Sequence, residues 1–349
     1  RYLRNSELRR EAREEQNRIG QTRLENQLFS TRCSHQPTTV QFHPYDSQII
    51  IAYKDSFTIW DYGNGNKICT VRNSGTERRG SGSRVTSLQY INGHDVALVV
   101  TGADDGAVRV WRQCGTLLTA WQALGKSSMP SSCYSGSLSG MVMAWDQLRQ
   151  ELIVGGDSRN LKVWDADKEL KVCDIPTGAD SCITCISLDP SGGWLMGVGC
   201  GDGTVRLFDR RISPLESRVM TYREHTAWVV AVGLSPGANS LISGSTCGDV
   251  RKFDTRKHSS ELTCQAQQGM KAMAVHPAAN IFACGSVNQI SVFRSSGASL
   301  NLIKSAYHEW FYSPRFGPVG CLTFHPHRVL LAAGSVDSTL SIYSADPKR

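Results

Sequence analysis

Short runs of alternating apolar and polar residues recur along the chain, and each run closes on an aromatic residue. The closing aromatics are Trp60, Trp111, Trp164, Phe208, Phe253, Phe293 and Tyr343. The gaps between them are 51, 53, 44, 45, 40 and 50 residues. One blade of a β-propeller occupies about 40–45 residues, so the pattern predicts seven blades, with loop insertions where the gap is longer.

Two further strand-like stretches precede these closing runs. In the fourth repeat they span residues 182–190 and 193–203, ahead of the closing run at residues 204–209. Gly, Asp and Pro residues separate the stretches, as the turns of an antiparallel meander require. The stretches are apolar on both faces, which suits a blade packed between two neighbours. We therefore expect an all-β fold, a seven-bladed β-propeller.

The seventh repeat ends at its third strand, because only six residues follow Tyr343. A three-stranded blade would leave an unpaired edge, and pairing the first and last segments of a ring removes such an edge. Residues 24–30 form a strand-like stretch, and we expect them to supply the missing strand. The predicted propeller therefore spans residues 24–349.

The segment ahead of this strand, residues 1–23, has the composition of a polar helix with few apolar residues. It is predicted to be a short polar helix or linker that follows a preceding domain. Because the chain starts at Arg1 and not at Met, we expect it to be a segment of a longer protein. Residues 73–83 and 125–140 are rich in Ser and Gly and are predicted to be flexible loops.

Composition excludes several classes of protein. The formal net charge of +7 is too mild to mark a nucleic-acid surface. No apolar run reaches the ~20 residues of a membrane helix, and no signal peptide opens the chain, so we expect a cytoplasmic protein without membrane insertion. Twelve Cys are too few for a disulfide scaffold. Cys182 and Cys185 form a C-x-x-C pair inside an expected strand, where free cysteines act as small hydrophobes.

No motif indicates catalysis. His43, His276 and His325 all fall in the same repeat position, a His-Pro pair after the first strand of a blade. A catalytic site would not recur three times around a ring, so these are predicted to be turn residues. Phosphate-binding loops, zinc-protease helices and nucleophile elbows do not occur in the sequence. The sequence predicts a protein that is not an enzyme and has no catalytic residues, cofactor or metal.

The repeats resemble WD40 repeats, whose blades often carry a buried network of His, Ser or Thr, Asp and Trp. Asp105, Asp202 and Asp337 each stand six residues before a closing aromatic, where that family places its Asp. His225 is the single His at the matching upstream position, and its blade has Cys247 in place of the Asp. We expect no blade to carry the complete network, so packing must hold the blades together.

One stretch gathers the residue types that dominate protein interfaces. Residues 219–230 include Tyr222, Arg223 and Trp228, and Tyr, Arg and Trp are enriched at interaction hot spots. These three are candidate partner-binding residues. The other interpretation is that Tyr222 and Trp228 pack between blades, because both flank expected strands.

Several stretches also resemble the C-terminal propeller of the Raptor family, the scaffold subunits of target-of-rapamycin complex 1. These stretches are residues 84–95, 101–111, 171–184, 218–230, 283–289 and 324–327. The resemblance implies a non-catalytic scaffold that helps to assemble the kinase complex and to present protein substrates in nutrient and growth signalling. The implied partners are the target-of-rapamycin kinase with its complex, protein substrates and regulators. Recruitment to the lysosomal surface is implied as well. Substrate-motif binding in that family is attributed to domains that this chain lacks, so no substrate-binding residue is carried over.

Two other classes of function remain open. Receptors of cullin-type ubiquitin ligases carry a W/F-D-x-R box on consecutive blades. Two stretches of this chain, residues 208–211 and 253–256, match it. Arg211 and Arg256 would then bind a cullin-ligase adaptor, or else pair locally at the blade rim. An RNA-binding propeller rests only on the basic stretch at residues 77–84 and on the mild positive charge of the chain. Such a protein would lose affinity for RNA steeply as the salt concentration rises.

Overall fold

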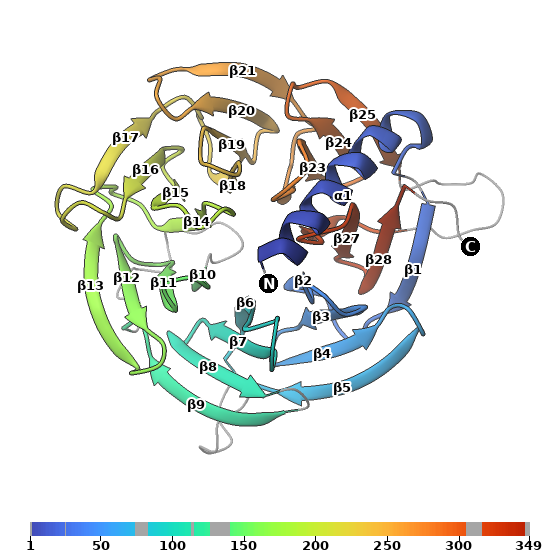
Figure 1. The fold of residues 1–349 in the computed structure, drawn as a ribbon, viewed down its shortest axis with the longest axis horizontal. Helices are drawn as coiled ribbons and strands as arrows, with labels where there is room; N and C mark the ends of the chain where they lie inside the picture. Colours follow the sequence, from blue (N-terminus) through green and yellow to red (C-terminus); the bar gives the residue numbers. More distant parts are fainter. Residues whose placement is uncertain are drawn as a thin grey trace.

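A computed structural model of the chain describes residues 2–24, 26–73, 83–112, 115–125, 140–304 and 316–345. Seven four-stranded antiparallel sheets surround a central axis (Figure 1). The prediction of an all-β, seven-bladed propeller is confirmed. Two of the expected loops, residues 73–83 and 125–140, lie almost entirely outside the described residues.

The blades follow one another along the chain, with the innermost strand first. Blades 1 to 3 consist of β2 (Thr39–Phe42), β3 (Gln48–Ala52), β4 (Ser56–Asp61), β5 (Asn66–Arg72); β6 (Val85–Ile91), β7 (Leu98–Ala103), β8 (Ala107–Arg112), β9 (Thr116–Gln122); and β10 (Val142–Asp146), β11 (Glu151–Gly155), β12 (Asn160–Asp165), β13 (Leu170–Pro176).

Blades 4 to 7 continue the order. They consist of β14 (Ile183–Leu188), β15 (Leu195–Cys200), β16 (Val205–Asp209), β17 (Arg218–Tyr222); β18 (Val229–Leu234), β19 (Ser240–Ser245), β20 (Asp249–Asp254), β21 (Ser260–Gln265); β22 (Ala272–Val275), β23 (Ile281–Gly285), β24 (Gln289–Arg294), β25 (Ser299–Lys304); and β26 (Val319–Phe324), β27 (Leu330–Ser335), β28 (Thr339–Ser344) with β1 (Asn26–Arg32).

Blade 7 is built from both ends of the described chain. β1 pairs antiparallel with β28, in a register that sets Phe29 opposite Ile342 and Arg32 opposite Thr339. Leu24, just ahead of the strand, is fully buried in the core beside this blade. The residues expected to close the ring therefore overlap the strand that lies on the outer edge of blade 7.

The apolar core runs continuously from blade to blade. In β3, Ile49, Ile50 and Ile51 are each fully buried, although successive side chains of a strand point to opposite faces. Each core cluster joins two neighbouring blades; one of them contains both Ile153 of blade 3 and Val198 of blade 4. This packing explains why the strands are apolar on both faces.

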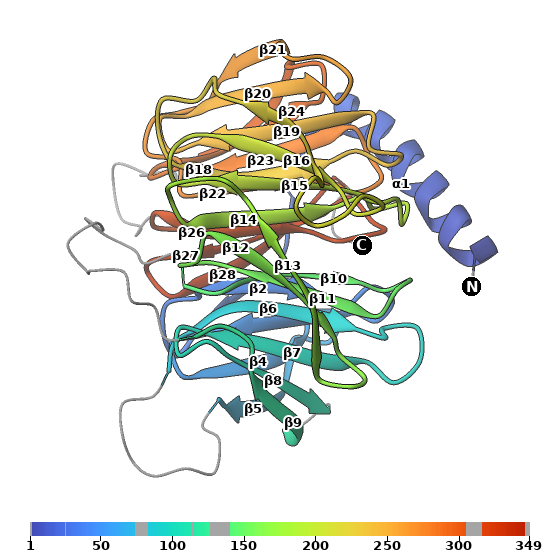
Figure 2. The ribbon, with the colours of Figure 1, turned by 90° about the vertical axis from the view of Figure 1, so that its left-hand side faces the viewer.

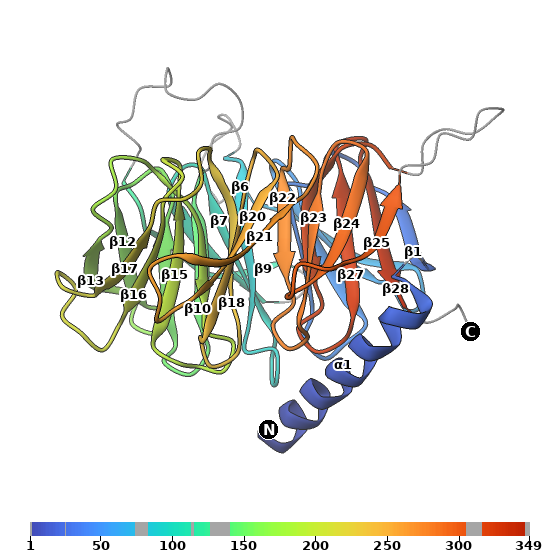
Figure 3. The same cartoon turned by 90° about the horizontal axis from the view of Figure 1, so that it is seen from above.

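Helix α1 (Tyr2–Thr22) lies across one face of the ring (Figures 1 and 3). The view in Figure 2 shows the same helix beside the stacked blades. Its less exposed positions are Asn5, Leu8, Arg9, Ala12, Glu15 and Gln16. These positions recur every three or four residues, so they form one stripe along the helix.

Hydrogen bonds to the first hairpin turns of several blades hold this stripe. Asn5 Oδ1 accepts from Tyr45 in blade 1 at 2.8 Å, and Arg9 donates to the Pro190 carbonyl in blade 4 at 2.9 Å. Glu15 accepts from the backbone of blade 7 at 2.9 Å, and Gln16 does the same in blade 6 at 2.9 Å. The helix thus spans the ring through polar contacts. Its role as a linker from a preceding domain stays a prediction.

The three His-Pro residues are turn residues, as predicted. The Nδ1 atom of His276 accepts hydrogen bonds from the backbone N–H groups of Ala278 and Ala279, at 3.0 and 2.8 Å. His43 and His325 make the same pair of contacts in their own turns. Burial lowers the pKa of all three rings, to about 4 for His276 and about 3 for His325. The rings are therefore neutral at pH 7, as acceptors at Nδ1 must be.

The buried polar network of blade 5 differs from the expectation. His225 lies 2.7 Å from Ser243 Oγ and 3.0 Å from Asp249 Oδ2. Asp249 stands two positions beyond Cys247, so an Asp partner is present although the usual Asp position holds a cysteine. The carboxylate comes from the first residue of β20, which the spacing argument did not consider. A phenylalanine closes the blade, so the network stops at His, Ser and Asp.

Cys182 and Cys185 lie in and beside β14 and are free thiols, as are the other cysteines in the described part of the chain. Burial raises the pKa of the Cys185 thiol to about 11, which keeps it protonated at neutral pH. Within the described residues, no group of three or more His, Cys, Asp or Glu side chains has a metal-binding arrangement. None of the described helices combines the length and the apolar character of a membrane-spanning helix.

Candidate partner-binding surfaces

The two arginines of the W/F-D-x-R boxes pair with the Asp of their own box. Arg211 donates to Asp209 through Nε at 3.0 Å and Nη2 at 2.6 Å, and Arg256 donates to Asp254 at 3.1 Å from both nitrogens. These hydrogen bonds lower the pKa of both carboxyl groups. Both arginine side chains stay mostly exposed, at 64% and 76%. The structure therefore contains the local rim pairing that the sequence left as one of two interpretations.

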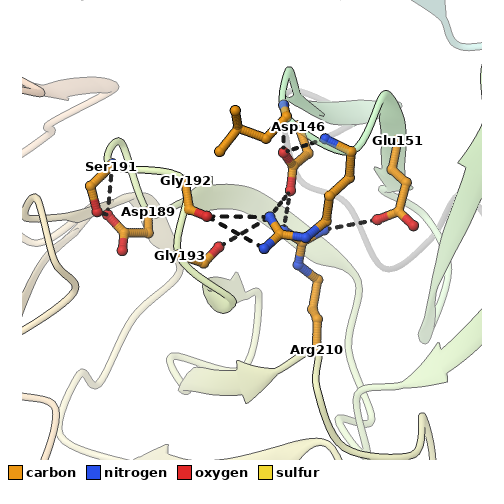
Figure 4. Close-up of polar contacts among 9 residues, drawn as sticks. Asp146, Glu151, Asp189, Ser191, Gly192, Gly193 and Arg210 are labelled. Carbon is orange, nitrogen blue, oxygen red and sulfur yellow. Dashed lines mark hydrogen bonds and ion pairs between the residues drawn. The ribbon is translucent and has the colours of Figure 1, made fainter. Parts of the chain in front are cut away.

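Arg210, next to Arg211, behaves in the opposite way. Its side chain is only 5% exposed and crosses to blade 3, where it pairs with Asp146 and, at 3.1 Å, with Glu151 (Figure 4). Burial alone would raise the pKa of Asp146, but hydrogen bonds from Arg210 and Arg149 hold it below its usual value. Burial raises the pKa of Glu151. This cluster joins blades 3 and 4 through charges.

Arg149 extends the cluster to the surface. Its Nη1 lies 2.7 Å from Asp146 and 3.4 Å from the carbonyl oxygens of Gly192 and Gly193 in blade 4. The guanidinium lies 3.6 Å from the ring centroid of Trp194. A cation over an indole face is attracted to it, so Arg149 fixes the orientation of an exposed aromatic ring.

The turns around this position carry four exposed apolar side chains, which we call the blade 3–4 patch. They are Leu148, Trp194, Ile212 and Leu215, with exposed fractions of 68%, 43%, 40% and 82%. The turns that carry them touch, because the Arg210 N–H donates to the Trp194 carbonyl at 3.1 Å. Gly192 also lies directly against Leu148. Clustered exposed apolar residues mark interaction sites more often than scattered ones do.

The patch faces the same side of the ring as α1. Arg9 of the helix bonds Pro190, in the turn that leads to Trp194. First hairpin turns of several blades therefore form one surface, with α1 on part of it and the blade 3–4 patch beside the turn that Arg9 contacts.

The three candidate partner-binding residues Tyr222, Arg223 and Trp228 do not gather on one surface. Tyr222 is 1% exposed, its ring stacks on Phe253 at 4.1 Å, and its hydroxyl donates to the Asp254 carbonyl at 3.3 Å. Trp228 is half-buried and close to Gly201. Arg223 is the exposed one of the three. Tyr222 is thus a core residue, as the packing interpretation held, because its ring fills the space between β17 and β20.

Sequence reasoning did not single out Leu148, Trp194 or Leu215. The signal was available, since all three are large apolar residues in turns between strands, where polar residues are usual. Arg210 was passed over as well, although it stands inside the box that drew attention to Arg211. A sequence does not distinguish a buried arginine from the exposed one that follows it.

Comparisons with known proteins agree with this fold. The WD domain, G-beta repeat family matches residues 73–112, 170–209, 216–254 and 311–344. "Protein raptor homolog" of Dictyostelium discoideum is 33% identical over 321 residues, which cover 88% of this chain and 21% of the relative. "Target of rapamycin complex 1 subunit mip1" of Schizosaccharomyces pombe is 30% identical over 331 residues, which cover 92% of this chain and 24% of the relative.

A solved structure supports the same assignment. The crystal structure of Chaetomium thermophilum Raptor superimposes with a TM-score of 0.80 at 28% identity, over 93% of this chain and 29% of that chain. The chain thus spans about a fifth to a quarter of the length of the curated relatives it matches. The similarity runs along nearly the whole propeller and does not reduce to repeat motifs. The chain belongs to the Raptor family, as a WD40 propeller of that family.

Proposed function

We propose that this propeller is a non-catalytic scaffold domain of a target-of-rapamycin complex 1 subunit. The observation that carries the proposal is the 30–33% identity to two relatives named as Raptor or as a subunit of that complex. In this role the domain helps to assemble the kinase complex and to present protein substrates in growth signalling. The protein works in the cytoplasm and is recruited to the lysosomal surface. The domain has no enzymatic activity of its own.

The blade 3–4 patch is the proposed contact with another subunit of the kinase complex. Trp194 supplies a rigid aromatic surface, and Arg149 with Asp146 holds the turn around it. Interfaces place such aromatic anchors at their centre and surround them with polar residues. Leu215, at 82% exposed, has the most to gain from being covered by a partner.

The ubiquitin-ligase interpretation has weaker support. Its two key residues, Arg211 and Arg256, already serve their own turns by binding Asp209 and Asp254. The relatives described above are named as Raptor or as a subunit of target of rapamycin complex 1. The local ion pairs already explain where both arginines lie, so the structure gives no separate support for an adaptor contact.

Substitution in the full-length subunit tests the proposal. Leu215→Ser with Trp194→Ala should reduce co-purification of the target-of-rapamycin kinase at least tenfold, with an unchanged thermal unfolding curve. Leu170→Ser is the matched control, because Leu170 is 62% exposed on β13, outside the patch. It should leave the association intact. Full kinase recovery with the double variant would refute the assignment of this patch.

Kinase and substrate assays test the scaffold role separately. The purified propeller should show no turnover alone. Adding the full-length subunit should raise phosphorylation of a protein substrate by the kinase complex. Turnover by the isolated propeller would contradict the non-catalytic assignment.

A further inference from the structure

A cleft of about 370 Å³ opens between blades 5 and 6, on the face that carries α1. Its walls include Lys252 of β20, Arg294 at the end of β24, the turn residues Ser295 and Ser296, and Gln16 of the helix. The volume lies in the range of small-molecule sites. Among the described residues, neither an Asp nor a Glu lines it.

Lys252 occupies a core position of the repeat. It directly precedes the closing aromatic of its blade, and the residues at this position in the other six blades are Ile59, Val110, Val163, Leu207, Val292 and Ile342. All six are buried, with at most 6% exposed. Blade 5 alone has a lysine here, which is half-buried and belongs to the lining of the cleft.

Arg294 likewise brings a positive charge to its repeat position. It follows the closing aromatic, a position that four blades fill with Asp61, Asp165, Asp209 and Asp254. Those carboxylates accept backbone N–H groups of the next turn, which a guanidinium cannot do. Blade 6 therefore has a positive charge, as blade 2 does with Arg112, where four blades have a negative one.

Neither cation is neutralised by a carboxylate within 4.0 Å in the part of the chain that the structure describes. Other cations of the same blade are paired: Arg251 with Asp249, Arg256 with Asp254, and Lys257 with Glu261. His276 also lines the cleft, but its lowered pKa, about 4, makes it neutral at pH 7, and both of its ring nitrogens are in use. The cleft is thus a positively charged site without a counter-ion of its own.

We propose that this cleft binds the phosphate group of a small phosphorylated solute, with Lys252 and Arg294 as the charged ligands. A guanidinium and an ammonium together suit a phosphate dianion, because each donates charge-assisted hydrogen bonds to its oxygens. The serine hydroxyls of the turn after β24 supply further donors. Gln16 accepts a hydrogen bond from the Asn280 N–H and so brings α1 to the lining of the cleft.

The ordinary alternative is that Lys252 simply extends its aliphatic chain along the apolar wall and exposes its ammonium to water. The two interpretations differ in what a phosphate compound does. Only a binding site gives an affinity that depends on Lys252 and Arg294 and not on other surface cations.

Calorimetric titration of the chain with inorganic pyrophosphate, at constant ionic strength set with potassium chloride, tests the proposal. Pyrophosphate should bind one site at least tenfold more tightly than acetate does. Lys252→Leu places the residue of blade 4 in this position, so the fold should persist, and the affinity should fall at least tenfold. Arg294→Gln, a change at an exposed residue, should weaken binding by a similar factor and decides the matter if the Leu variant does not fold.

Lys257→Met is the matched control, since Lys257 belongs to the same blade but lies outside the cleft lining. It should bind pyrophosphate as the unchanged chain does. The proposal is overturned if the unchanged chain does not bind, if Lys252→Leu and Arg294→Gln bind as well as it does, or if Lys257→Met loses as much affinity as they do. A phosphoserine peptide that binds tenfold more tightly than pyrophosphate would overturn the small-solute assignment in favour of a phosphorylated protein.

Discussion

Two parts of the ring join their neighbouring blades by different chemistry. From blade 6 through blade 2, a neutral histidine at each boundary contacts an aromatic ring of the next blade, in the pairs His276–Phe324, His325–Phe42 and His43–Tyr90. Their ring centroids are 5.1 to 5.3 Å apart. Between blades 3 and 4, the buried pair of Arg210 and Asp146 makes the connection at the same face.

The two kinds of connection differ in the free energy that it costs to bury them. A neutral imidazole that accepts two backbone N–H groups stabilises its turn without placing a charge in the core. A buried ion pair must first recover the hydration energy of both partners, and it does so only with further hydrogen bonds. Arg149 and Glu151 supply such bonds around the pair. The histidine boundaries should therefore tolerate high salt and fail in acid, whereas the charged boundary should be intolerant of losing one partner.

Opening the ring inside the histidine part should have the largest effect. Deleting residues 1–32 removes β1 and leaves the outer edge of β28 unpaired. We expect a lower melting temperature and aggregation, measured by differential scanning fluorimetry and size-exclusion chromatography. Deleting residues 1–23 removes α1 but keeps β1, so this matched truncation should not aggregate. An unchanged melting curve for the longer deletion would refute the closing role of β1.

Removing one partner of the charged boundary should have the next largest effect. Arg210→Ala leaves the buried Asp146 with Arg149 as its one remaining cation and leaves Glu151 without Arg210. An uncompensated buried charge costs about 3–5 kcal/mol of unfolding free energy, so we expect a loss that approaches this value. Urea unfolding followed by tryptophan fluorescence measures it. Arg211→Ala is the adjacent control, because its side chain is 64% exposed. Equal unfolding midpoints for the two variants would mean that the Arg210 pair does not stabilise the ring.

Acid should act first on the histidine boundaries. The folded pKa of His276, about 4, lies below its ordinary value of 6.5, so the neutral ring stabilises the fold above pH 6.5. That stability is lost as the pH falls toward 4, and the shift corresponds to about 3 kcal/mol. The pKa of Asp146 is also lowered, from 3.8, so its contribution is lost only below about pH 4.

Urea midpoints measured between pH 7 and pH 4 test this order. His276→Asn keeps an acceptor for the turn but does not titrate, so its stability should depend less on pH than that of the unchanged chain. The same steep loss of stability in both proteins would show that His276 does not set the acid sensitivity.

The ring itself could be predicted from the sequence because the residues that form each blade recur along the chain. Closing aromatics recur at blade spacing, and the His-Pro turns occupy one repeat position, so each blade supports the interpretation of the others. The docking of α1 could not be predicted in this way. Three of the four hydrogen bonds described above join helix side chains to turn backbone, as far as 314 residues away, and backbone acceptors and donors leave no residue pattern.

The candidate sites were harder still. Arg210 and Arg211 are neighbours of one type, yet one is buried and one exposed, because Arg210 is directed toward blade 3 and Arg211 toward its own turn. Tyr222 has the composition of a hot spot but fills the core. Lys252 stands out only when the seven repeats are aligned on their closing aromatics. Burial and orientation, which decide function here, depend on the neighbouring blade.

Substituting the exposed arginines of the two W/F-D-x-R boxes should have the smallest effect on stability. The same substitutions distinguish the two leading functions. Arg211→Ala with Arg256→Ala removes two rim ion pairs whose arginines are 64% and 76% exposed, so the urea midpoint should not change measurably. If the propeller serves the kinase complex through the blade 3–4 patch, kinase co-purification with the full-length double variant should be unchanged. If it serves a ubiquitin ligase, the cullin adaptor should be lost while the kinase remains. Loss of the kinase from a folded variant would contradict both assignments, because it would place the kinase contact on the rim beside Asp209 and Asp254.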